Sequence, residues 1–89
     1  MRIVFAGTPQ AAVPALDGLV AAGHELVAVV TREDAPVGRK RVLTPSPVAA
    51  RAEELGLEVV RANRLDEAVA ERLLALEPDL GVIVAYGGL

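Results

Sequence analysis

Short apolar runs alternate with amphipathic stretches along the chain. Three runs are rich in β-branched residues and end at turn or loop residues, as buried strands do; they cover residues 3–6, 26–30 and 80–85. Residues 58–60 form a weaker candidate strand. Because the strong runs are apolar throughout rather than alternating, the pattern predicts parallel strands that are covered on both faces.

Helices are predicted between these strands, because apolar residues recur there at spacings of three and four. Gly23, Gly56 and Pro78 follow the amphipathic stretches and predict where they stop. The recurring apolar positions are Val13, Leu16, Leu19 and Val20 in the first stretch, Val48, Ala52 and Leu55 in the second, and Val69, Leu73 and Leu76 in the third.

The starts of the predicted helices carry side chains suited to an N-cap. Thr8 and Ser46 each precede a proline, and Asp66 precedes the third helix. The resulting order, β-α-β-loop-α-β-α-β, predicts a Rossmann-like, doubly wound α/β fold with a parallel sheet and right-handed crossovers. Residues 1–89 are expected to form one truncated domain, because a doubly wound sheet normally continues beyond its switch point.

Composition narrows the functional classes. The chain has no Cys and a single His, which excludes disulfides, thiolate metal sites and multi-histidine metal sites within it. A net charge of −3 excludes attraction of nucleic acid by the molecule as a whole, so any such binding requires a local patch. Neither a signal-peptide pattern nor a long apolar segment is present, and we expect a cytoplasmic protein with no metal and no membrane contact.

Ligands of an open parallel sheet bind beyond the carboxyl ends of its strands. Gly7 and Thr8, residues 32–46 and residues 86–89 are expected at that edge. His24 precedes the second strand and is expected at the opposite edge, as a turn residue rather than a general base.

Gly7 and Thr8 occupy the place of a dinucleotide-binding fingerprint but match it poorly. Only the first glycine of G-x-G-x-x-G is present, Pro9 removes an N–H donor, and no acidic residue ends the second strand. NAD(P) binding is therefore disfavoured. Two interpretations of Gly7 and Thr8 stay open: a tight turn with a helix cap, and an anion site at a helix N-terminus.

Residues 32–46 form a fifteen-residue stretch with no predicted structure, which is uncommon in a short chain and usually functional or disordered. Its cations Arg39, Lys40 and Arg41 suit backbone phosphates. The alternative is a solvated charged loop. Glu33 and Asp34 are adjacent carboxylates that we expect to be solvated.

Tyr86, Gly87, Gly88 and Leu89 follow the last apolar run, and the glycines would let the backbone approach a ligand closely. Alternatively, Tyr86 simply covers the core. The sequence contains no catalytic constellation, since it lacks a Cys nucleophile and a Ser-His pair at one edge. Residue patterns alone thus predict an α/β unit with a basic loop, without naming a reaction.

Three stretches of the chain resemble the methionyl-tRNA formyltransferase family in order and spacing. They are Arg-Ile-Val-Phe-Ala-Gly-Thr-Pro at residues 2–9, Gly38-Arg39 running to Leu-Thr-Pro-Ser-Pro-Val at residues 43–48, and Val-Ala-Tyr-Gly at residues 84–87. Residues 23–31 resemble the family's second strand, so the similarity covers essentially the whole chain.

The resemblance implies transfer of a formyl group from formyl-tetrahydrofolate to the amino group of methionyl initiator tRNA by a monomeric enzyme. It implies that the loop at residues 32–46 reaches the tRNA acceptor stem, with Arg39 in the main role and Arg41 in support. It also implies that residues 86–89 begin the folate-binding wall.

Several departures from the family pattern bear on these expectations. Glu33 stands where a proline is common, Ala35 where an arginine is common, and Lys40 where a glycine is common. The family's catalytic Asn, His and Asp, its Ser-Leu-Leu-Pro run and its tRNA-binding barrel have no match here. The chain by itself is therefore expected to be inactive. The alternatives are an NAD(P)-binding Rossmann protein, a non-catalytic tRNA-binding module, and another formyltransferase of the same fold.

Overall fold

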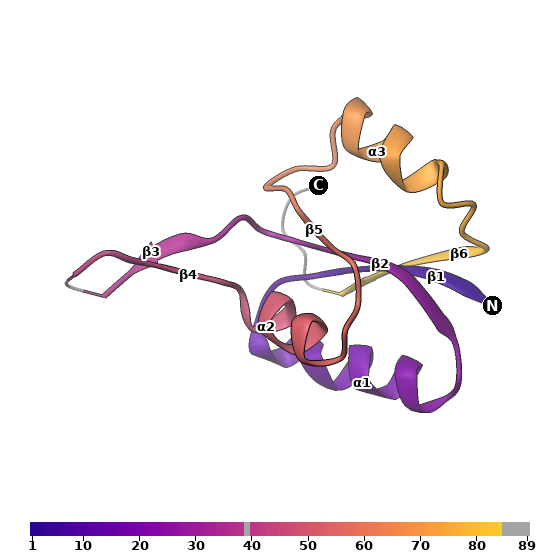
Figure 1. The fold of residues 1–89 in the computed structure, drawn as a ribbon, viewed down its shortest axis with the longest axis horizontal. Helices are drawn as coiled ribbons and strands as arrows, with labels where there is room; N and C mark the ends of the chain where they lie inside the picture. The colour runs from indigo at the N-terminus through magenta and orange to yellow at the C-terminus, as the bar shows by residue number, and fades with distance from the viewer. Residues whose placement is uncertain (39, 85–89) are drawn as a thin grey trace.

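The structure, a computed structural model, describes residues 1–38 and 40–84. Its central sheet contains β1 (Arg2–Gly7), β2 (Glu25–Thr31), β5 (Val59–Arg61) and β6 (Leu80–Val84) in the order β5-β2-β1-β6 (Figure 1). All pairings within it are parallel. Counted along the chain this is the order 3-2-1-4, the beginning of a doubly wound sheet. The predicted strands and the predicted fold class are confirmed, except at residue 85, which lies outside the described residues. The prediction that all three strong runs are covered on both faces is wrong for β6, because it lies at the edge of the sheet and its Leu80 and Ile83 are 46% and 51% exposed.

Helices cover both faces of this sheet. α1 (Val13–Ala21) and α2 (Pro47–Glu54) lie on one face and α3 (Glu67–Leu74) lies on the other, as Figure 1 shows. Two apolar clusters result, one on each face of the sheet. The buried residues are Ile3, Phe5, Ala12, Val13, Leu16, Leu26, Val29, Val48 and Ala52 on the α1–α2 face, and Val4, Ala6, Ala28, Val30 and Val60 on the α3 face.

Two of the three predicted helix caps are confirmed. The Ser46 hydroxyl accepts a hydrogen bond from the Ala49 N–H at 3.0 Å, and an Asp66 carboxylate oxygen accepts one from the Val69 N–H at 2.9 Å. The prediction for Thr8 is wrong, because a 3₁₀ helix, η1 (Gln10–Ala12), precedes α1 and Ala12 is the N-cap. Pro14, in the first turn of α1, was the sequence signal for the true start.

Ser46 has a second role that predicts a measurable stability difference. Its Oγ lies 2.5 Å from the Thr31 Oγ1, and both residues are fully buried. Ser46→Ala should therefore lower the free energy of unfolding by roughly 2–3 kcal/mol, since it removes a cap and leaves a buried hydroxyl without its partner. Asp66→Ala, which removes an exposed cap only, should cost about 1 kcal/mol. Urea unfolding of both variants checks this, and equal losses would contradict it.

The region predicted to be an unstructured loop contains a β-hairpin instead. β3 (Ala35–Val37) and β4 (Val42–Thr44) pair antiparallel, with Ala35 opposite Thr44. Gly38 (φ 78°) and Arg41 (φ 52°) take the left-handed conformations that close the turn. Figure 1 shows the hairpin extending away from the sheet and its helices. The prediction failed because these strands are short and their Val42 and Leu43 side chains are exposed, so no burial pattern marks them.

His24 lies between α1 and β2, at the amino end of the sheet strands, as predicted. Its backbone N–H donates to the Leu19 carbonyl at 3.3 Å, next to Gly23, whose φ of 86° ends the helix. His24 is thus a turn residue, remote from the carboxyl edge of the sheet.

Candidate functional site

The carboxyl ends of β1 and β6 meet at the switch point of the sheet. Gly7 and Val84, the last residues of these strands, are partners in the β1–β6 register. α1 leaves β1 on one face, whereas α3 enters β6 from the other face, so the crossovers diverge here. Open α/β sheets bind ligands at such a point. Tyr86, Gly87, Gly88 and Leu89, the predicted folate-proximal residues, follow β6 and lie outside the described residues.

Gly7 is buried where β1, β6 and η1 approach one another closely. A Cβ at this position would lie 2.9 Å from the Val84 carbonyl oxygen and 3.1 Å from the Ala12 Cβ. Glycine is therefore required by packing, and this requirement accounts for Gly7 without any bound anion. The possible anion site at Gly7 and Thr8 stays a prediction.

This packing argument predicts opposite effects for two glycine substitutions. Gly7→Ala should lower the free energy of unfolding by roughly 1–3 kcal/mol, because a backbone carbonyl must move to admit the methyl group. Gly18→Ala is the matched control, since a Cβ at Gly18 in α1 meets nothing within 4 Å. It should stabilise the chain by about 0.5–1 kcal/mol through helix propensity. Urea unfolding measures both, and a Gly7→Ala variant as stable as the parent would refute the argument.

The end of β1 also departs from a dinucleotide-binding turn in its geometry. In that motif the helix follows the strand closely and its first N–H groups face the pyrophosphate. Here η1 separates β1 from α1, and Pro14 removes a further N–H from the first turn of α1. The geometry therefore disfavours the NAD(P)-binding alternative.

The turn of the hairpin carries unpaired positive charge. Lys40 and Arg41 are exposed, and within residues 1–38 and 40–84 neither forms an ion pair. By contrast, Arg2, Arg51, Arg61 and Arg72 each pair with a carboxylate. Arg39 is the third cation of the predicted site and lies outside the described residues. Lys40 and Arg41 are thus available to meet an external polyanion.

The base of the hairpin is tied to the sheet edge by polar contacts. An Arg32 Nη1 donates to the Thr44 carbonyl at 3.1 Å, and the Glu33 N–H donates to the Asn63 Oδ1 at 3.0 Å. The Arg61 Nε donates to the Asp34 Oδ1 at 2.9 Å. The expectation that Asp34 is merely solvated is wrong, because Arg61 at the end of β5 reaches it.

Arg61 and Asn63 were not among the predicted site residues. Arg61 ends β5, next to β2 in the sheet, so both strands deliver their carboxyl ends to the same edge. The edge rule applied to residues 58–60 would have found them. The pKa of the Arg61 guanidinium is raised above its ordinary value, chiefly by its hydrogen bond to Asp34 and then by that to Glu53.

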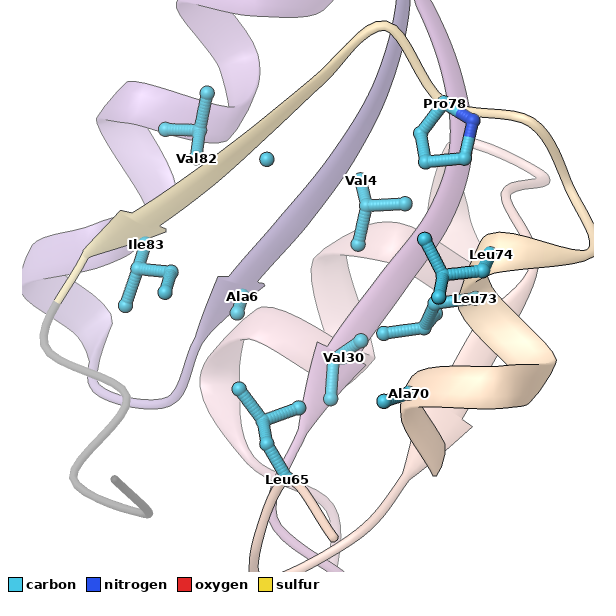
Figure 2. Close-up of a pocket in the computed structure, with 11 residues that line it drawn as sticks. Val4, Ala6, Val30, Leu65, Ala70, Leu73, Leu74, Pro78, Val82 and Ile83 are labelled. Carbon is cyan, nitrogen blue, oxygen red and sulfur yellow. The ribbon is translucent and has the colours of Figure 1, made fainter. Parts of the chain in front are cut away.

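An apolar cleft of about 290 Å³ lies between α3 and strands β1 and β6 (Figure 2). Leu74 and Ile83 are among its lining residues and are 70% and 51% exposed. None of the described residues that line it has a charged or hydrogen-bonding side chain, so these residues offer no acid, base or nucleophile. The lining residues are Val4, Ala6, Val30, Leu65, Ala70, Leu73, Leu74, Pro78, Gly81, Val82 and Ile83.

Among the residues that the structure describes, no three His, Cys, Asp or Glu side chains cluster so that they could hold a metal ion. No described helix has the length and apolar character needed to cross a bilayer.

Comparison with protein families matches residues 1–89, the whole chain, to the family described as formyl transferase. The chain belongs to this family. Similar proteins include the methionyl-tRNA formyltransferases of Leifsonia xyli subsp. xyli and of an Arthrobacter species, which are 68% and 66% identical over 89 residues. That of a Nocardioides species is 59% identical over 90 residues. Each alignment covers 100% of this chain but only 28–29% of the relative.

This formyl transferase therefore spans less than a third of the length of the curated relatives that it matches. The matched residues of this chain form the 3-2-1-4 sheet and the β3–β4 hairpin.

Proposed function

We propose that this formyl transferase acts as part of a methionyl-tRNA formyltransferase. The reaction would move a formyl group from formyl-tetrahydrofolate to the amino group of methionyl initiator tRNA. The observation that carries the proposal is the 68% identity to a methionyl-tRNA formyltransferase over all 89 residues. Lys40 and Arg41 in the hairpin turn support it. They form no ion pair with a described residue, and a tRNA substrate requires contacts to phosphates.

In this proposal the hairpin turn binds the acceptor stem of the tRNA. Lys40 and Arg41 are exposed and unpaired among the described residues, and Arg39 lies between Gly38 and Lys40 in the sequence. Arginine can contact a phosphate with two parallel hydrogen bonds, and lysine adds a point charge. The local patch is needed because the chain as a whole carries a net charge of −3.

The folate co-substrate would bind beyond the carboxyl ends of β1 and β6. Residues 86–89, which follow β6 in the sequence, would begin the wall of its site. Gly7 contributes indirectly, since the absence of a side chain lets β1 and β6 approach and so sets the shape of the edge. No metal is needed for the transfer.

The chemistry itself sets a further requirement. The amine nitrogen would attack the formyl carbon and a base would remove the amine proton. The bond from the formyl carbon to the folate nitrogen would then break, and the departing nitrogen would take up a proton. The reaction thus needs a general base and donors that stabilise the developing oxyanion. We propose that segments corresponding to the rest of the longer relatives supply this set, in a monomeric cytoplasmic enzyme.

Deletion of the gene that encodes the chain tests this proposal in cells. Initiator methionyl-tRNA should lose its formyl group, and the full-length gene product should restore it. Acid gel electrophoresis of the tRNA separates the two forms. Fully formylated tRNA in the deletion strain would overturn the assignment, and the chain would then be better explained as a non-catalytic tRNA-binding module.

A further inference from the structure

We propose that Arg61 is a positioning residue that fixes the direction in which the β3–β4 hairpin points, and so controls tRNA binding without touching the tRNA. This inference rests on the proposed function. It assigns a role to a side chain that lies on the sheet, outside the basic turn.

Arg61 joins the entrance of the hairpin to two elements of the body. Its backbone belongs to β5, whereas its Nε donates to the Asp34 Oδ1 at 2.9 Å, directly before β3. Its Nη2 donates to the Glu53 Oε1 on α2. One guanidinium therefore connects the hairpin base, the sheet and a helix.

The neighbouring contacts hold both strands of the hairpin at their base. The Asn63 Oδ1 accepts a hydrogen bond from the Glu33 N–H, in the segment that leads into β3. Arg32 donates one to the carbonyl of Thr44, the last residue of β4. Below these contacts, Thr31 and Ser46 are joined through their buried hydroxyls. Arg61 differs from these residues because it holds a side chain, that of Asp34, in the segment that leads into β3.

The geometry of the hairpin amplifies small movements at its base. The turn begins at Gly38, four residues beyond Asp34, so it lies about 13 Å away along an extended strand. A rotation of about 15° at the base would shift the turn by roughly 3 Å, which exceeds the tolerance of charge-assisted hydrogen bonds to phosphate. A contact at Asp34 therefore affects contacts made at Lys40 and Arg41.

The stability of the fold should depend little on Arg61. Its side chain and that of Asp34 are 34% and 36% exposed, and exposed ion pairs contribute little to folding. Arg51 provides a matched control, because it bridges Asp17 on α1 and Glu54 on α2 with a similar exposure of 36%. Like Arg61, Arg51 pairs with two carboxylates, but neither of them lies at the base of the hairpin.

The test uses equilibrium binding of methionyl initiator tRNA to the full-length gene product. Arg61→Gln should raise the Kd for tRNA roughly three- to tenfold, whereas Arg51→Gln should leave it unchanged at a comparable shift in Tm. In steady-state assays the KM for tRNA should rise, while kcat and the KM for the formyl donor stay the same. A Kd for Arg61→Gln no higher than that for Arg51→Gln would overturn the proposal.

Asp34→Asn separates positioning from direct contact with the tRNA. Loss of a negative charge near a polyanion site would strengthen binding if charge alone mattered, or if Arg61 bound the tRNA itself. Positioning instead predicts a two- to fivefold weaker Kd, roughly, because a neutral amide oxygen accepts the Arg61 N–H more weakly than a carboxylate does and so loosens the base of the hairpin. Tighter binding by Asp34→Asn would therefore refute the role of Arg61, and this variant keeps Glu53 as a partner for Arg61.

The hairpin-turn variants distinguish failure of this inference from failure of the proposed function. If Lys40→Ala with Arg41→Ala weakens tRNA binding but Arg61→Gln and Asp34→Asn do not, only the positioning role is wrong. If the turn variants leave the Kd unchanged, the tRNA-binding role of the hairpin fails, and the role of Arg61 fails with it.

Discussion

Replacing both Lys40 and Arg41 by alanine in the full-length gene product should weaken its binding to initiator methionyl-tRNA by roughly 10- to 100-fold at physiological salt. The two side chains are exposed and unpaired among the described residues, so they can displace counterions from the tRNA. Each lost phosphate contact should also flatten the dependence of log K on log salt concentration by about 0.9. Filter binding or fluorescence anisotropy at several salt concentrations measures both effects.

Arg72→Ala is the control for this prediction. Arg72 is an exposed arginine of α3, away from the hairpin, and its removal changes the net charge by the same amount per residue. It should leave tRNA affinity and the salt slope nearly unchanged. Equal losses for Arg72→Ala and for single alanine variants of the turn would show that overall charge, rather than the hairpin, determines binding.

The 89-residue chain on its own should transfer no formyl group, whereas the full-length gene product should be active. The prediction follows from the proposal that segments corresponding to the rest of the longer relatives supply the general base and the oxyanion donors. General acid–base catalysis and oxyanion stabilisation together account for about four or more orders of magnitude in rate. Mass spectrometry of methionine released from the tRNA would detect the product.

A control for this comparison is the tRNA affinity of the same 89-residue preparation. Measurable, salt-sensitive binding together with absent transfer would separate the recognition element from the catalytic residues. Formyl transfer by the purified 89-residue chain would contradict the prediction outright.

The central strands β1 and β2 could be predicted because their side chains are buried on both faces of the sheet. Residues 3–6 and 26–30 are apolar throughout, and burial of every side chain is what a central parallel strand requires. The caps at Ser46 and Asp66 were equally predictable, since each depends on contacts within four residues. Local chemistry and burial pattern were sufficient for this part of the fold.

The hairpin could not be predicted in the same way. Its Val42 and Leu43 are 59% and 67% exposed, so the strands form without the burial that produces a recognisable pattern. The role of Arg61 was missed for a related reason. Its partner Asp34 is 27 residues away in the sequence and becomes a neighbour only when β5 aligns with β2. Pairings between exposed charges depend on the assembled tertiary structure.

The most direct test of the central claim is a transfer assay with purified full-length gene product, formyl-tetrahydrofolate and competing acceptors. Methionyl initiator tRNA, an amino nucleotide sugar and an amine precursor of purines are supplied together, and the formylated product is identified by mass spectrometry. The account predicts that the formyl group appears on the methionine of the tRNA. Formylation of either small acceptor in place of the tRNA, or of none of the three, would contradict it.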